Sequence, residues 1–343
     1  MATIVYVACA GPREIHCFNL DAELGALELF DVVTVPGGDE PSPSNMPLAL
    51  APSRRMLYAA LRTAPYPVTA FAIDPATGRL SCQGAAALPA PMAYISAGKR
   101  QLFAASYKQG LVSVSALDSD GTLGPATQVI HTPPKAHCII AGRHSGVVYA
   151  TTVDGNAIMV FRHDAETGRF TSDRPHLVEC RPGSGPRHLA LHPQLDVLYC
   201  VNELAGTLAA FAIENESGSL REMQYETLTP AEFTGNARAA DLHITADGRF
   251  AYASVRNTNA MAAFRIESRT GLLVPVERFD VEGSPRAFAL DPGGRHLICA
   301  GQTDNVIGVY AIDPERGVLT RRHQVFVPEN PSWIETLVIE AMS

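Results

Sequence analysis

The sequence predicts an all-β protein that forms a closed ring of seven four-stranded antiparallel sheets. Three observations predict this fold: a turn motif that recurs, a strand motif that recurs in phase with it, and two chain ends that together supply the last sheet. Repeats of about 40–50 residues that are rich in strand signals are typical of sheets arranged radially around an axis. Helical periodicity is not evident over any long window.

The turn motif consists of an acidic residue, a few polar residues, a glycine and an apolar residue. Its glycines lie 43 to 53 residues apart. Asp and Pro favour the start of a turn and glycine accepts positive φ, so each copy is expected to connect two strands of a hairpin. The seven copies span residues 21–27, 74–80, 118–123, 164–170, 214–220, 267–273 and 313–319.

The strand motif is a pair of apolar segments, the second often of the form Leu-Tyr-Ala. Six pairs occur, at 47–50 with 57–59, 91–95 with 102–104, 136–140 with 148–150, 186–191 with 198–200, 240–244 with 251–253 and 285–290 with 297–299. A seventh first segment, at 331–334, has no partner after it, because the sequence ends.

The N-terminal segments 4–8, 15–18 and 27–30 supply the strands that the last copy lacks. We therefore expect three N-terminal strands and one C-terminal strand to share a sheet, which closes the ring and removes free sheet edges. This is the architecture of a seven-bladed β-propeller. We expect residues 1–343 to form one such domain.

Composition excludes several classes of function. The net charge of −8 argues against nucleic acid and anionic membrane surfaces as partners. No apolar run approaches the length of about 18 residues that spans a membrane. The seven cysteines form no Cys-x-x-Cys pair, which favours reduced thiols and a cytoplasmic location. No nucleotide-binding or metal-binding motif is present, so we expect no cofactor and no metal, in a monomer or weak homo-oligomer.

Polar residues interrupt the repeat at one predicted face of the ring. The starts of the innermost strands and the loops after the second strands open on the same face of a propeller. The copies beginning at Pro186, Ala240 and Pro285 carry charged residues there, whereas others carry residues such as Pro47 and Met92. A purely structural repeat would carry the same residue type in every copy. The candidate site residues are His137, Arg187, His188, Glu203, Asp241, His243, Arg256, Arg286 and Gln302.

Structural roles remain open for several of these residues. Asp241 is equally consistent with a turn residue that binds backbone amides. His188 also fits a packing role, and His137 lies in an apolar segment that suits a core histidine. Arg187 and Glu203 are open to pairing with each other, although burying an ion pair is a poor way to gain stability.

The amino-acid sequence around these residues resembles that of the seven-bladed lactonase family. That family contains the propeller-type bacterial 6-phosphogluconolactonases and the fungal 3-carboxymuconate lactonising enzymes. The resemblance covers essentially the whole chain. It is carried by Gly185–Pro193, Leu198–Leu204, Ala239–Gly248 and Leu297–Gln302.

The resemblance implies a site of one His, two Arg and one Glu. By order and spacing these are His137, Arg187, Arg256 and Glu203. It implies hydrolysis of a sugar-acid lactone, above all 6-phospho-D-glucono-1,5-lactone to 6-phosphogluconate in the pentose phosphate pathway. The alternatives are a 3-carboxy-cis,cis-muconate cycloisomerase, which uses the same cations without water, and a non-enzymatic scaffold.

Each candidate residue has an expected role in lactone hydrolysis. Two arginines suit an anionic substrate and the oxyanion that forms when water attacks the carbonyl. Glu203 is expected to act as general base, and His137 or His243 to protonate the leaving oxygen. We expect substrate-binding roles for His188, Asp241, His243, Arg286 and Gln302. Tyr107, Trp333 and the loop 229–239 are expected at the same mouth.

Overall fold

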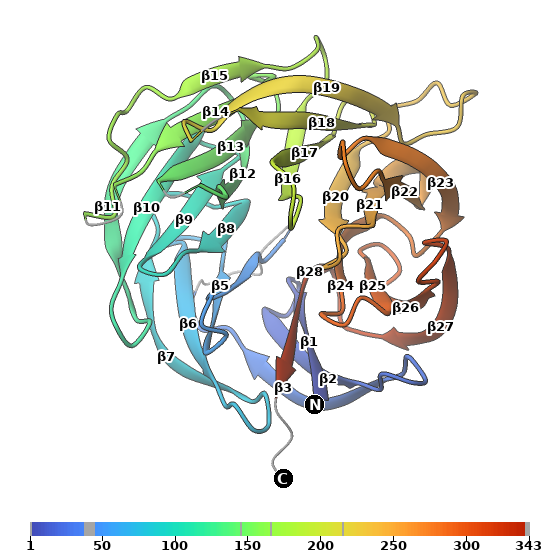
Figure 1. Ribbon diagram of the computed structural model, residues 1–343. Coiled ribbons are helices and arrows are strands. Elements are labelled where there is room, and N and C mark those ends of the chain that lie inside the picture. The colour runs from blue at the N-terminus through green and yellow to red at the C-terminus, as the bar shows by residue number, and fades with distance from the viewer. Residues whose placement is uncertain (1, 38–44, 145, 165–166, 215, 340–343) are drawn as a thin grey trace.

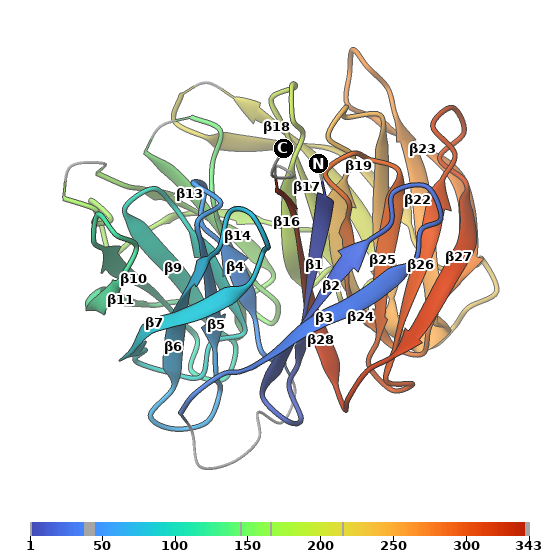
Figure 2. The same ribbon diagram turned by 90° about the horizontal axis from the view of Figure 1, so that it is seen from below.

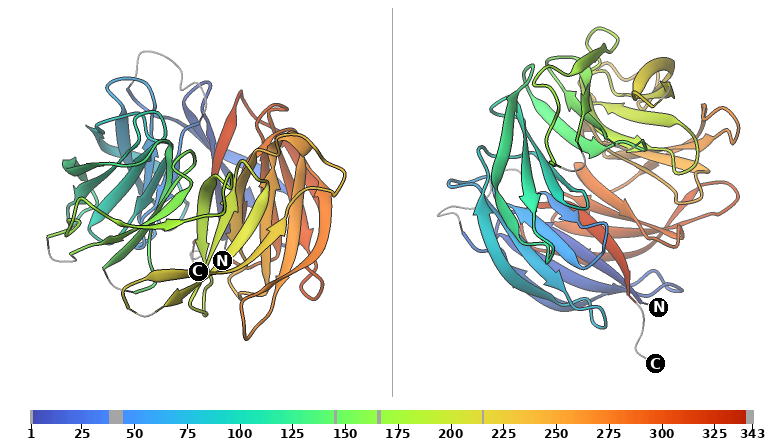
Figure 3. Two further views of the ribbon diagram at one scale, coloured as in Figure 1. Left: turned by 90° about the horizontal axis from the view of Figure 1, so that it is seen from above. Right: turned by 60° about the vertical axis from the view of Figure 1, so that its left-hand side comes forward.

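The computed structural model describes residues 2–37, 45–144, 146–164, 167–214 and 216–339. In these residues, 28 strands form seven four-stranded antiparallel sheets around a common axis (Figure 1). The predicted seven-bladed β-propeller is thereby confirmed. Seen from the edge and from two further directions, the sheets are twisted and packed face to face (Figures 2 and 3).

The strands of each blade run from the axis outward. In that order they are β28 (Pro331–Ile339), β1 (Ala2–Cys9), β2 (Glu14–Leu20) and β3 (Leu27–Thr34); β4 (Leu48–Leu50), β5 (Met56–Ala60), β6 (Pro67–Ile73) and β7 (Leu80–Ala87); β8 (Tyr94–Ala97), β9 (Gln101–Ser106), β10 (Leu111–Leu117) and β11 (Leu123–His131); β12 (Ala136–Ala141), β13 (Val147–Thr152), β14 (Ala157–Arg162) and β15 (His176–Glu179); β16 (Pro186–Leu191), β17 (Val197–Asn202), β18 (Thr207–Glu214) and β19 (Ser219–Thr227); β20 (Ala239–Ile244), β21 (Phe250–Val255), β22 (Ala260–Ile266) and β23 (Leu273–Asp280); β24 (Pro285–Leu290), β25 (His296–Gly301), β26 (Val306–Ile312) and β27 (Leu319–Phe326). A single 3-10 turn of the described chain, η1 (Arg256–Thr258), follows β21.

The two ends of the chain close the ring as predicted. β28 pairs with β1 in antiparallel register, with Ile4 opposite Leu337 and Ala8 opposite Trp333. In Figure 1 the dark red β28 lies beside the dark blue β1 and completes the innermost layer. The shared blade leaves the ring without a free edge at its closure.

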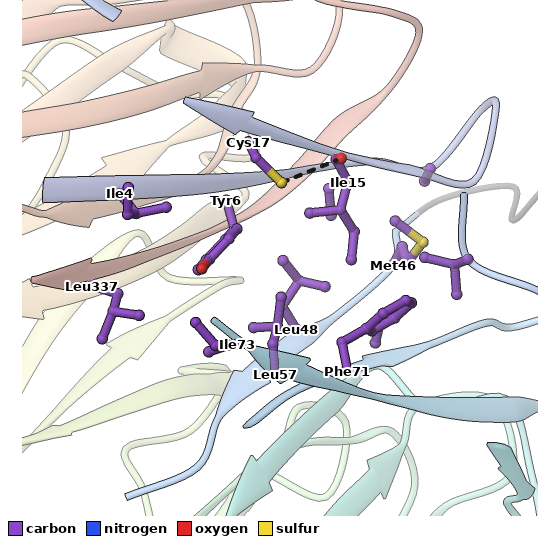
Figure 4. Packing of buried hydrophobic residues seen from close by; sticks show 14 of the residues in the cluster. Ile4, Tyr6, Ile15, Cys17, Met46, Leu48, Leu57, Phe71, Ile73 and Leu337 are labelled. Atoms are coloured by element: carbon purple, nitrogen blue, oxygen red, sulfur yellow. Dashed lines mark hydrogen bonds between the residues drawn. The ribbon is translucent and has the colours of Figure 1, made fainter. Parts of the chain in front are cut away.

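The hydrophobic core lies between neighbouring blades. Figure 4 shows the layer between the β28–β3 blade and the β4–β7 blade, where Ile4, Tyr6, Leu57 and Phe71 are fully buried and Leu337 is nearly so. Burial of one such side chain contributes about 1.5–3 kcal/mol. Among the described residues, no helix is long and apolar enough to cross a membrane.

A hydrogen bond between the two sequence motifs ties one blade to the next. The hydroxyl of Tyr6 donates to the carbonyl oxygen of Gly78 at 2.7 Å. Gly78 has φ +71°, and an added Cβ would lie 2.7 Å from the side chain of Ile4, so glycine is required there. The same bond joins Tyr58 to Gly121, Tyr149 to Gly218, Tyr199 to Gly271 and Tyr252 to Gly317.

Candidate active site

β-Bulges near the starts of innermost strands determine where the candidate side chains lie. At a bulge, two residues of one strand lie opposite a single residue of its neighbour. The side chain of a bulged residue therefore points in a different direction from the one that regular pairing would give it. β12, β16, β20 and β24 each shift register against the next strand at this point. The residues within these shifts include His137, Arg187, Asp241 and Arg286.

Hydroxyl groups of the second strands satisfy backbone groups that the bulges release. Thr151 Oγ1 accepts a hydrogen bond from the Cys138 N–H at 3.1 Å and donates to the Arg187 carbonyl at 2.6 Å. Ser254 Oγ accepts from the Asp241 N–H at 3.0 Å. Buried backbone groups are almost always paired, so these hydroxyls hold the bulged conformation in place.

A cavity of about 220 Å³ lies at the starts of the innermost strands and under the loops that follow the second strands. We call it the arginine cavity. Its position is the one predicted for the site, and the structure brings five of the candidate residues together there. Its lining consists of Arg62, Ala93, Tyr107, His137, Arg187, Glu203, Arg238, Arg256 and Arg286.

Glu203 bridges two buried arginines in the arginine cavity. Arg187 Nε lies 3.1 Å from Glu203 Oε2, and Arg256 Nη2 lies 2.9 Å from Glu203 Oε1. Arg187 also donates to the Ala240 carbonyl, and Arg256 Nε donates to the Arg238 carbonyl at 3.0 Å. Burial opposes ionisation of Glu203, but both guanidinium groups together hold its pKa below the ordinary value. The carboxylate is therefore ionised and fixes the orientation of both arginines.

His137 presents an unpaired nitrogen beside these charges. Its side chain is 3% exposed, and its Nδ1 has no hydrogen-bond partner among the described residues. Burial, and then the positive charge of Arg187, lower the pKa of His137 well below its ordinary value. His137 is therefore neutral at neutral pH and carries a lone pair that can accept a proton.

Arg286 adds a further guanidinium group to the arginine cavity. In the described part of the chain, no hydrogen bond or ion pair engages it, although it lines the cavity. Burial, and then repulsion from Arg187 and Arg256, lower its pKa well below the ordinary value. Burial and Arg187 likewise lower the pKa of Arg256 to about 10. A site with this excess of positive charge favours an anionic ligand.

A second cavity, of about 280 Å³, lies farther along the same innermost strands. We call it the axial cavity. His188, Asp241 and His243 line it, together with Trp333 and Glu335. Trp333 and these three substrate-binding candidates therefore line a different cavity from Arg187. The bulge in β16 sends Arg187 to the mouth and leaves the next residue, His188, facing the axis.

Gln302 lines neither the arginine cavity nor the axial cavity. Its Nε2 instead donates to Asn330 Oδ1 at 2.5 Å, in the segment that leads into β28. The loop 229–239 does reach the arginine cavity as predicted, through Arg238.

Three charged residues of the two cavities were not singled out from the sequence. Arg62 follows β5 at nearly the same point of the repeat as Glu203 after β17 and Arg256 after β21. This equivalent position in the repeat could have identified Arg62 as a site residue from the sequence. Arg238 precedes β20 in a connecting loop that is longer than most of its equivalents in the other blades. Glu335 lies inside β28, opposite Tyr6 of β1.

The described residues contain no group of three or more His, Cys, Asp or Glu side chains arranged to hold a metal ion. The arginine cavity offers guanidinium, imidazole and carboxylate groups. Together these groups can bind an anion, stabilise developing negative charge and move a proton.

Comparison with known proteins agrees with the fold and with the site's chemistry. Residues 4–336 match the family described as "Lactonase, 7-bladed beta-propeller". A 6-phosphogluconolactonase of Klebsiella pneumoniae (strain 342) is 34% identical over 337 residues, which cover 97% of this chain and 98% of that protein. A 6-phosphogluconolactonase of Serratia proteamaculans (strain 568) is 34% identical over 339 residues, covering 98% and 99%.

Among solved structures, the periplasmic gluconolactonase PpgL of Pseudomonas aeruginosa has a TM-score of 0.89 and 28% identity, covering 99% of this chain and 100% of that chain. A putative 6-phosphogluconolactonase from Bacteroides uniformis has a TM-score of 0.86 and 26% identity, covering 98% and 99%. The chain belongs to the seven-bladed β-propeller lactonase family of carboxylic ester hydrolases.

Proposed function

We propose that this lactonase hydrolyses 6-phospho-D-glucono-1,5-lactone to 6-phosphogluconate, the reaction for which its curated relatives are named. The Arg286 guanidinium in the arginine cavity, which has no hydrogen-bond or ion-pair partner among the described residues, carries the proposal. A partly buried cation without such a partner favours a ligand that brings negative charge. A phosphorylated lactone supplies a phosphate in addition to the ester carbonyl that reacts.

The arginines divide into two groups with different tasks. Arg286 lies at the start of β24 without a partner and is assigned to the phosphate, with Arg62 and Arg238 adding positive charge to the same cavity. Arg187 and Arg256 are held by Glu203 and are assigned to the carbonyl oxygen, where negative charge develops during attack.

His137 is the proposed general base. Its imidazole removes a proton from water as the water oxygen bonds to the carbonyl carbon. The ring C–O bond then breaks, and the ring oxygen takes the proton from the His137 imidazolium to give the open-chain hydroxy acid. Burial, and then the charge of Arg187, lower the pKa of His137, and an anion bound beside the arginines opposes the second of these effects.

This assignment revises the role expected for Glu203. Both carboxylate oxygens are engaged by arginine, and the lowered pKa makes the group a weak base. We assign Glu203 to holding Arg187 and Arg256 in place. Replacing Glu203 by Gln and His137 by Asn in separate variants distinguishes the two roles, because the loss of the base lowers kcat by about 10²–10⁴-fold.

An unphosphorylated gluconolactone is the second candidate substrate, because the similar PpgL structure is of a gluconolactonase. A cycloisomerase reaction is not proposed, since the curated relatives are named lactonases. The test compares kcat/KM for the two lactones, following proton release above spontaneous hydrolysis. We expect the phosphorylated lactone to be preferred about tenfold to a hundredfold, from about 1.5–3 kcal/mol per hydrogen bond to a charged group. Equal values for the two lactones contradict the phosphate assignment.

The proposal also places the protein in the cytoplasm. All seven cysteines are free, and a reducing compartment keeps thiols in that state. Fractionation of the producing cells tests the location, and recovery in the periplasmic fraction contradicts it.

A further inference from the structure

A file of aromatic and imidazole rings joins the arginine cavity to the axial cavity. The ring centroids of His137 and His188 are 5.1 Å apart. Tyr94 and Trp333 pack against His188 at 5.1 and 5.9 Å. His137 lines the arginine cavity and His188 lines the axial cavity, so the contact between the two rings is the boundary between the cavities.

His188 is bound on one side only. Its Nδ1 lies 2.7 Å from Asp241 Oδ1, while its Nε2 is buried without a partner in the described chain. The side chain is 5% exposed. The ionised Asp241 fixes the tautomer in which Nδ1 carries the hydrogen, so Nε2 carries the free lone pair.

Asp241 continues the file to the open part of the axial cavity. Its Oδ2 lies 3.3 Å from His243 Nε2, and the backbone N–H groups of Leu242 and Phe288 donate to the two carboxylate oxygens. The His243 side chain is 39% exposed. His188, Asp241 and His243 therefore connect a buried nitrogen beside the arginine cavity to solvent on the other side.

Hydrolysis of a lactone releases a proton that must leave the active site. The product is a carboxylic acid that ionises at neutral pH, so each turnover releases one proton. The arginine cavity is lined by cations, which disfavour a hydronium ion or a protonated buffer there. The axial cavity carries the carboxyl groups of Asp241 and Glu335, which favour a proton.

We propose that His188, Asp241 and His243 carry the proton released by hydrolysis from His137 to solvent in the axial cavity. This inference rests on the proposed function. The product acid gives its proton to neutral His137, which passes it to Nε2 of His188. The proton on Nδ1 of His188 moves through the Asp241 carboxylate to Nε2 of a neutral His243, and from there to water. Only N–H and O–H bonds change, since His243 releases the hydrogen on its Nδ1 to water, and turns of the His188 and His243 rings restore their first tautomers.

His243, at the solvent end of the file, has a higher pKa than His188, whereas Asp241 between them stays ionised: burial opposes its ionisation, but His243 and His188 hold its pKa well below the ordinary value. The pKa of His137 is well below its ordinary value, and burial and Arg187 lower the pKa of His188 to about 4. Burial opposes protonation of His243, but Asp241 holds its pKa above the ordinary value. Burial raises the pKa of Glu335 to about 7. Tyr94 is the other titratable group that lines this cavity, and burial keeps it neutral.

The test uses His243→Asn in the full-length protein, because the His243 side chain is only partly buried. With 6-phosphogluconolactone at low buffer concentration, we expect kcat to fall about tenfold or more, within the effect of a positioned acid–base group. KM is expected to stay unchanged, since the phosphate lies in the other cavity. Added imidazole, which is small enough for the axial cavity, is expected to restore kcat.

His144→Asn is the matched control, since His144 is 29% exposed and lines neither cavity. An unchanged kcat for His243→Asn at low buffer overturns the proposal, and so does a lowered kcat that imidazole fails to restore. A wild-type protein that is inactive on the lactone refutes the proposed function instead, so the two failures are distinguishable.

Discussion

The arginine cavity and the axial cavity are built from the same innermost strands but have opposite electrostatic character. In the first, guanidinium groups surround one carboxylate, and burial together with Arg187 lowers the pKa of His137. In the second, the carboxyl groups of Asp241 and Glu335 lie among imidazoles and aromatic rings. Arg187 and His188 are adjacent in sequence and belong to different cavities.

The comparison shows how a repeated fold acquires two environments along one axis. The repeat supplies equivalent strands, and local bulges decide which side chain faces which cavity. We infer that the chemistry belongs to the arginine cavity and that the axial cavity serves proton transfer. The following changes separate the two regions, beginning with the largest expected effect.

Replacement of Glu203 by Gln removes the carboxylate that compensates two buried arginines. Breaking a buried pair costs about 3–5 kcal/mol, so the free energy of unfolding in urea is expected to fall by that amount at neutral pH. The pKa of Glu203 is lowered in the folded protein. Its stabilising contribution is therefore present above the ordinary Glu pKa and is lost as the pH falls toward the folded value, so the two proteins converge in acid.

Glu222→Gln is the control for this change, because Glu222 pairs with Arg181 at the surface. An exposed pair contributes about 0–1 kcal/mol. Equal losses for Glu203→Gln and Glu222→Gln contradict a buried compensating role for Glu203.

Replacement of Arg187 by Ala removes a donor to the developing oxyanion. We expect kcat to fall about 10²–10³-fold, as on loss of an oxyanion-hole donor. Steady-state kinetics with the phosphorylated lactone measure this, and surface Arg181→Ala is the control. Activity that stays within a few-fold of wild type excludes Arg187 from the chemistry.

Replacement of Arg286 by Ala should affect binding more than chemistry. The loss of one charge-assisted hydrogen bond corresponds to about 1.5–3 kcal/mol, so KM for the phosphorylated lactone rises about tenfold to a hundredfold while kcat is retained. The unphosphorylated lactone serves as the control substrate, since it lacks the group assigned to Arg286. Equal effects on both lactones show that Arg286 does not bind phosphate.

The smallest effect is expected far from both cavities. Tyr199→Phe removes the hydroxyl that donates to the Gly271 carbonyl at 2.6 Å. Thermal and urea unfolding should show a loss of about 0.5–1.5 kcal/mol, with kcat and KM unchanged. A lowered kcat in this variant indicates that blade packing, rather than the cavities alone, controls activity.

The fold was predictable from sequence because each turn repeats the same local chemistry. Asp21 accepts from the N–H groups of Glu23 and Leu24, both at 2.8 Å, and the equivalent Asp74 and Asp313 accept in the same way. Such contacts lie within one short segment, so they are visible in the order of residues. The closing blade was predictable because the last copy lacked the strands that the N-terminus supplies.

The candidate site was predictable only in part. The position of a residue in the repeat placed Arg187, Glu203 and Arg256 at one mouth. It did not separate His188, Asp241 and His243 from them, because that separation depends on bulges set by pairing between strands. Gln302 occupies the expected position in the repeat, but its side chain forms a hydrogen bond with Asn330 in a neighbouring loop. No local sequence pattern encodes that contact.

The most direct test of the account is a crystal structure of the protein with the product 6-phosphogluconate bound. The account predicts the phosphate within hydrogen-bond distance of Arg286 and the carboxylate beside Arg187 and Arg256, with the axial cavity free of product. Product bound in the axial cavity between Asp241 and Glu335, or away from the arginines, contradicts the assignment of the chemistry to the arginine cavity.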